Sequence, residues 1–276
     1  MSERLWRSLL WVAAALLVAF GLPSFVAPVW ASGEFPWTVG PFLAQTIGGW
    51  SVGTAAIAAL AAYFGRPRFV YALVVYCGLF GLFELIVVIG FLDKLQVGKV
   101  LTYPYLGGLA CLIAAAAVFA VGWWLQSRPA TAASGDRAAL WHRALALAVG
   151  GFVTVLAVGT LFAGPNGATA RGEVFPEPMG LFSIRAFSAF LFAIALSMAS
   201  LLPARDSAPY FALALAGLCL IVPITLPALL NLSLFTFDRP GTMVYLIAYI
   251  AVGVVLAAAI SYRQLRRREL SSPDAA

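Results

Sequence analysis

Two ionisable residues lie inside long apolar runs of this sequence, and their depths indicate a shared site. Glu84 lies about 13 Å from the outer end of the third run, and Arg185 lies about 7–8 Å from the same end of the sixth. A charge near the bilayer centre costs about 2.5–3.5 kcal/mol on insertion scales, so such a residue usually has a partner. An Arg side chain spans most of the depth difference of about 6 Å. Gln45 occupies the position of Arg185 in an internal repeat.

These residues predict a ligand site. Glu84, Arg185 and Gln45 would form an outward-facing polar layer that binds a small solute or an ion. Two structural interpretations stay open. In the first, Glu84 and Arg185 are an ion pair that locks the third run to the sixth. In the second, Arg185 extends alone to the outer interface.

The sequence offers little for catalysis. It has one histidine, His142, and no HExxH, G-x-S-x-G, Walker A or GxGxxG motif. Of the 11 acidic residues, only Glu84 lies in an apolar run, and no pair of a nucleophile with a positioned base stands out. The three cysteines all lie in apolar runs, as buried single cysteines do. We therefore expect no enzyme activity, no cofactor and no metal site.

The composition is that of a membrane protein. Hydrophobic residues make up 63% of the 276 residues and charged residues 10%, against about 45–50% and 25% in soluble domains. The mean hydropathy is +0.97. A spanning helix needs about 20 apolar residues. We predict an all-α, polytopic transmembrane bundle with eight spans, at about 8–26, 41–63, 69–92, 101–125, 143–163, 180–202, 209–231 and 243–262.

The positive charges predict the orientation. With the N-terminus inside, 12 of the 17 Lys and Arg residues lie in inside segments, four lie outside and Arg185 lies within a run. This split follows the positive-inside rule and places both termini in the cytoplasm of a bacterium, with the chain in the inner membrane. It also explains the net charge of +6 without nucleic acid. A cleaved signal peptide ending at Ala31 is an alternative interpretation of the first run.

The chain contains an internal duplication. Leu5-Trp6-Arg7 matches Leu140-Trp141-His142-Arg143, and Gly33-Glu34-Phe35-Pro36 matches Gly172-Glu173-Val174-Phe175-Pro176. We predict two four-helix repeats, at 1–125 and 141–262, joined by a cytoplasmic linker at 126–140 and followed by a basic tail at 263–276. Four spans are an even number, so the repeats would be related by a pseudo-two-fold axis along the membrane normal.

Two further patterns concern helix packing. Gly49 and Gly53 form a GxxxG pattern, which allows close helix approach, and we interpret it as packing within the chain rather than a dimer face. Pro223 and Pro227 lie in the seventh run and are expected to kink or break its helix.

Two segments resemble other sequences. Residues 35–45 (FPWTVGPFLAQ) and 238–241 (DRPG) are similar to stretches in uncharacterised multi-pass membrane proteins of high-GC bacteria, in which the position of Gln45 is often Arg. The resemblance implies no activity.

Three classes of function remain. A transporter or solute-binding protein is favoured by the parallel repeat, the Glu84–Arg185 layer and the prolines of the seventh run. An accessory or assembly subunit of a membrane complex is favoured by the scarcity of polar lining and the short loops. A membrane enzyme is the least favoured. The expected partners are the lipid bilayer and either another membrane subunit or a small solute.

Overall fold

The protein is a bundle of long helices. The computed structural model describes residues 2–125, 138–164, 179–235, 237 and 240–271. Within them lie α1 (Ser2–Val26), α2 (Pro28–Gly33), α3 (Pro41–Phe64), α4 (Pro67–Gly90), η1 (Leu92–Lys94), α5 (Thr102–Leu125), α6 (Leu140–Leu161), α7 (Leu181–Ala199), α8 (Ala208–Leu230), η3 (Leu232–Leu234) and α9 (Pro240–Ser271). Most of the predicted linker and the motif at 172–176 lie outside these residues.

The helical membrane bundle predicted from hydropathy is confirmed. Seven helices in the described residues, α1 and α3 to α8, are long and apolar enough to cross a membrane. Each ends within three residues of its predicted run. The helix α9 covers the predicted eighth run, and its apolar part among the described residues is Leu246–Ser261. The eighth crossing therefore stays a prediction.

Proline and glycine set the tight connection between α3 and α4. Both helices start at a proline, Pro41 and Pro67, which has no N–H to leave unpaired in the first turn. α3 ends at Gly65, whose φ of 61° lies in the left-handed region that favours glycine. The Arg7 guanidinium packs against this glycine, so a Cβ there would lie 2.9 Å from the Arg7 Cζ.

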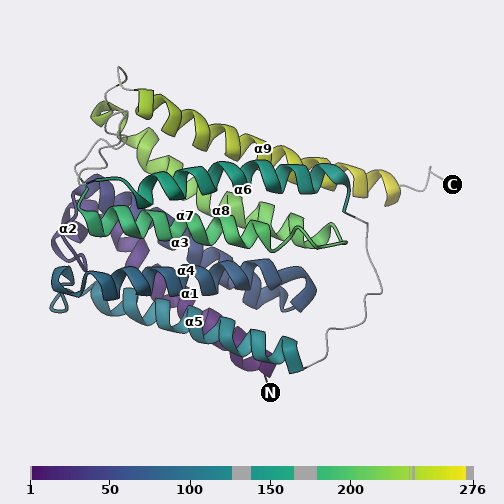
Figure 1. Cartoon of the computed structure of the whole chain (residues 1–276), viewed down its shortest axis with the longest axis horizontal. Coiled ribbons are helices and arrows are strands. Elements are labelled where there is room, and N and C mark those ends of the chain that lie inside the picture. The colour runs from purple at the N-terminus through teal and green to yellow at the C-terminus, as the bar shows by residue number, and fades with distance from the viewer. Residues whose placement is uncertain (1, 126–137, 165–178, 236, 238–239, 272–276) are drawn as a thin grey trace.

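The helices pack as two groups joined by a central seam (Figure 1). α1 packs along α3 and α5, and α4 packs along α5; α6 packs along α7, and α8 along α9. Across the seam, α3 packs against α8 and α4 against α7. α1 begins and α9 ends at the same end of the bundle (Figure 1).

The seam between α3 and α8 depends on matched glycines and prolines. A proline has no N–H, so it frees the carbonyl four residues earlier: Pro223 frees that of Cys219, and Pro227 frees that of Pro223. These two carbonyls are the ones that approach α3. A Cβ on Gly53 would lie 2.5 Å from the Cys219 oxygen, and one on Gly49 would collide with the Pro223 oxygen. The GxxxG pattern therefore packs within the chain, as predicted.

α8 is not broken at its prolines. It runs from Ala208 to Leu230 with Pro223 and Pro227 inside it, so the break considered from the sequence is absent. Elsewhere the seam is filled by aromatic rings: Trp50 stacks on Phe190 at 4.8 Å between centroids, and Phe80 meets Phe190 edge-on at 6.3 Å. All three side chains are buried, so this part of the bundle is solid.

Candidate functional site

Glu84 is buried near the C-terminal end of α4, with 1% of its surface exposed. The Tyr105 hydroxyl, from α5, donates to its Oε2 at 2.9 Å. Its Oε1 has no hydrogen-bond partner among the described residues. An unpaired buried polar atom costs about 1–3 kcal/mol, so this oxygen is the one unsatisfied group in the predicted polar layer.

Aromatic rings surround this carboxyl–hydroxyl pair. The Tyr105 ring lies 5.1 Å from Phe20 and 5.4 Å from Trp37. The Trp37 indole N–H donates to Ser183 Oγ of α7 at 2.9 Å, and its ring lies 4.2 Å from Phe182. Trp37 is 2% exposed. It packs against Tyr105 and ties the pair to the second half of the chain.

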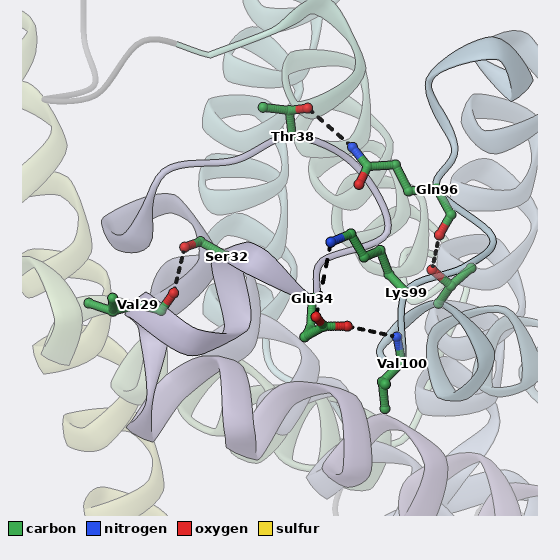
Figure 2. Close-up of polar contacts among 8 residues, drawn as sticks. Val29, Ser32, Glu34, Thr38, Gln96, Lys99 and Val100 are labelled. Carbon is green, nitrogen blue, oxygen red and sulfur yellow. Dashed lines mark hydrogen bonds and ion pairs between the residues drawn. The ribbon is translucent and has the colours of Figure 1, made fainter.

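The loop that carries this tryptophan is held by its neighbours (Figure 2). Glu34 accepts a hydrogen bond from the backbone N–H of Val100 at 3.3 Å, and its other oxygen lies 4.0 Å from Lys99 Nζ. Gln96 Nε2 donates to Thr38 Oγ1 at 3.3 Å. These bonds join the α2–α3 loop to the connection between η1 and α5.

Arg185 is half-buried in the second turn of α7 and does not pair with Glu84. Its Nη1 donates to the carbonyls of Thr160 at 2.9 Å and Ala163 at 3.1 Å. These carbonyls lie at the carboxyl end of α6, where backbone oxygens lack helical donors and a cation is favourable. The structural ion pair considered from the sequence is therefore absent, and Arg185 caps a helix.

Gln45 also forms its hydrogen bonds within the chain. Its Nε2 donates to the Phe25 carbonyl near the end of α1 at 3.1 Å. Its Oε1 accepts from Asn231 Nδ2 at 2.9 Å, and the same Nδ2 donates to the Pro227 carbonyl at 2.8 Å. Gln45 and Arg185 are each the fifth residue of their helix, and each donates to the end of the long helix before it.

A pair of arginines makes the same kind of contact at the opposite end of these helices. Arg7 Nε, near the start of α1, donates to the Ala62 carbonyl near the end of α3 at 2.8 Å. Arg143 Nη2, near the start of α6, donates to the Ala204 carbonyl beyond the end of α7 at 3.2 Å. The helix pairs α1–α3 and α6–α7 are thus each tied at both ends by a polar side chain on a carbonyl.

The three predicted site residues do not converge. Glu84 is joined to Tyr105, Arg185 to the end of α6, and Gln45 to Asn231. Sequence reasoning missed Tyr105 and Asn231 because it looked for charges. In the sequence, the feature that could have indicated them is a polar group close to the end of an apolar run.

α6 is the most exposed of the seven long apolar helices. Only 11% of its most apolar 18-residue window is buried, against 39% for α1 and 67% for α7. On its outward side we define the open face of α6 as Ala144, Ala148, Gly151, Val155 and Gly159, all exposed. The larger side chains of Leu147, Phe152 and Val158 are exposed beside it. A Cβ on either glycine would meet nothing within 4 Å.

Other candidate chemistry is limited in the described part of the chain. No group of three His, Cys, Asp or Glu side chains could hold a metal ion there. His142 stacks on Trp141 at 3.7 Å and its Nδ1 accepts the Ala139 N–H at 3.1 Å.

Comparison with known proteins assigns no activity. The chain matches no family model, and no curated protein or solved structure is significantly similar to it.

Proposed function

We propose that this chain is an accessory subunit of a membrane complex and that the open face of α6 docks a transmembrane helix of another protein. The observation that carries the proposal is the low burial of α6, 11% of its most apolar window. α6 has its extensive packing, among the described residues, with α7 alone. An apolar helix held on one side only has the rest of its surface available.

The chemistry of the open face fits a helix as its occupant. Lipid tails are as apolar as leucine, so helices associate in a membrane by close packing, for which small residues are needed. The backbone of α8 packs closely against Gly49 and Gly53 of α3. Gly151 and Gly159 of α6 have the same small surface and face open space. A partner helix would complete this contact.

Solute transport through the polar layer is less well supported. Gln45 and Arg185 both donate hydrogen bonds to backbone carbonyls of the same chain. Two hollows in the described residues, of about 1070 Å³ and about 60 Å³, are lined by neither of them, nor by Glu84. Solute or ion binding at Glu84, Arg185 and Gln45 remains the second candidate, and the unpaired Glu84 Oε1 is the observation that favours it.

The proposal includes a topology. The chain would cross a bacterial inner membrane eight times, as two tandem four-helix units with both termini in the cytoplasm. Gln45 and Arg185 make matching hydrogen bonds to backbone carbonyls in the two halves, and so do Arg7 and Arg143. These matching bonds support the two units. A membrane-impermeant thiol reagent should label Gly33→Cys in intact cells, and label Ala275→Cys only after permeabilisation. Labelling of Ala275→Cys in intact cells would contradict the eighth crossing.

The docking proposal is tested by the size of the native assembly. The full chain is extracted from its own membranes in mild detergent, as wild type, as Gly151→Trp on α6 and as Val121→Trp on α5, whose Val121 is 56% exposed. We expect a complex larger than one chain that Gly151→Trp reduces at least tenfold and Val121→Trp leaves intact. A single chain, a complex of identical copies, or equal loss from both variants would overturn the proposal.

A further inference from the structure

A large groove opens at the end of the bundle where α4 starts, and no residue of α6 lines it. It has a volume of about 1070 Å³ and lies between α4, α5 and the connection from α7 to α8. Its size is that of a large ligand site. It contains none of the residues of the open face of α6 or of the predicted polar layer.

The walls of the groove are apolar and carry small side chains. Gly78 and Leu82 on α4 and Ala116, Ala117 and Ala120 on α5 line it, among larger apolar side chains. These residues belong to membrane-spanning helices, so the groove lies within the hydrocarbon part of the bundle. A soluble anion would gain nothing from such walls, whereas an acyl chain buries apolar surface along them.

The mouth of the groove is polar and mostly basic. Arg68 at the start of α4 and Arg205 in the α7–α8 connection line it together with Asp206. Arg205 is exposed. Asp206 Oδ1 is buried and has no hydrogen-bond partner among the described residues. The Tyr71 hydroxyl, which also lines the groove, donates a hydrogen bond to the Ser200 carbonyl at 3.3 Å.

We propose that this groove binds a glycerophospholipid with an anionic phosphate and a hydrogen-bond donor in its headgroup. The acyl chain lies along Gly78 and Ala117, and the phosphate lies between Arg68 and Arg205. A headgroup hydroxyl donates to the unpaired Asp206 Oδ1. Arginine recognises phosphate because its planar N–H groups match the phosphate oxygens, and basic residues next to a membrane attract anionic lipids.

The test is lipid retention by the full chain in native mass spectrometry. The probes are dioleoyl phosphatidylglycerol, which has headgroup hydroxyls, and dioleoyl phosphatidylcholine, which has the same chains and no headgroup donor. We expect the wild type to retain phosphatidylglycerol at least fivefold better. Arg205→Gln should reduce this retention about fivefold, as expected for one basic residue at a membrane surface.

Matched controls separate the groove from general charge and from misfolding. Arg66→Gln removes the same charge from an exposed residue that does not line the groove, and it should leave retention unchanged. Ala117→Trp fills the groove from an exposed wall position and should reduce the retention of both lipids. Inorganic phosphate at the same concentration should not displace the lipid.

The outcomes that overturn the proposal are distinct from failure of the α6 docking. Equal retention of the two lipids, equal losses from Arg66→Gln and Arg205→Gln, or displacement by inorganic phosphate would each contradict a lipid site. If Ala117→Trp retained both lipids as well as the wild type does, the bound lipid would lie outside the groove, which would also contradict the proposal. None of these results depends on the assembly state of the chain.

Discussion

The glycines of α3 and of α6 have opposite surroundings. Gly49 and Gly53 face the carbonyls of α8 so closely that neither site has room for a methyl group. Gly151 and Gly159 face open space. The same residue type on an apolar helix thus marks a finished contact in one half of the molecule and an unused surface in the other.

The difference extends to the helices themselves. In the first half, α1 packs along both α3 and α5. In the second half, the described residues of α6 and α9 do not pack along each other in this way. A hollow of about 60 Å³ lies between α6, α8 and α9, lined by Val149, Leu213 and Leu256 among others. The first half closes on itself, whereas the second leaves its outer helices apart.

Adding a methyl group to the occupied face should have the largest effect. In Gly49→Ala the new Cβ would collide with the Pro223 oxygen, and overpacking a well-packed interface costs about 1–3 kcal/mol. We expect a clearly lower melting temperature in detergent. Gly159→Ala, the matched change on the open face, should shift stability by less than about 0.5 kcal/mol. Equal effects of the two changes would remove the distinction between the faces.

The buried carboxyl of the closed half provides the next test. Tyr105→Phe would leave both Glu84 oxygens unpaired, at a cost of about 1–3 kcal/mol of unfolding free energy. Glu84→Gln keeps an acceptor for the Tyr105 hydroxyl and should cost less. Denaturant unfolding in micelles measures both. A larger loss from Glu84→Gln than from Tyr105→Phe would mean that the carboxyl has another partner.

Arg185 should behave as a helix cap with a smaller effect. Arg185→Gln would weaken its bonds to the Thr160 and Ala163 carbonyls, at a cost of about 1 kcal/mol. Because Arg185 and Glu84 do not pair, the double variant with Glu84→Gln should be additive within about 0.5 kcal/mol. A coupling above about 1 kcal/mol in this cycle would restore the ion pair that the sequence allowed.

Hydropathy predicted the helices well, but it could not predict which side chains meet. The ends of the long runs agree with the helix ends because lipid requires uninterrupted apolar stretches. The ion pair of Glu84 with Arg185, one of the interpretations left open by the sequence, is absent because position along a helix gives depth and not the direction around its axis. Glu84 faces Tyr105 on α5, and Arg185 faces the end of α6.

Packing details were also only partly readable. The GxxxG pattern predicted close approach, and the prolines predicted a kink or break, but only the fold shows that Gly49 and Gly53 meet the carbonyls freed by Pro223 and Pro227. The exposed surface of α6 had no sequence signal, because an apolar helix looks the same whether lipid or protein covers it.

Removing room from the open face should have the smallest effect on the isolated chain. Gly151→Ala adds a methyl group where nothing lies within 4 Å, so the purified chain should melt within about 0.5 kcal/mol of the wild type. A strong loss of stability would show that α6 is covered within the chain itself.

The most direct test of the docking proposal is a photo-crosslinking scan along α6 in native membranes. A photoreactive residue is placed singly at each position from 144 to 159. The account predicts one protein adduct of constant size, strongest at Ala144, Ala148, Gly151, Val155 and Gly159 and weak at the buried Val153 and Ala157. Adducts that are uniform along the helix, that contain a second copy of this chain, or that contain lipid alone would contradict it.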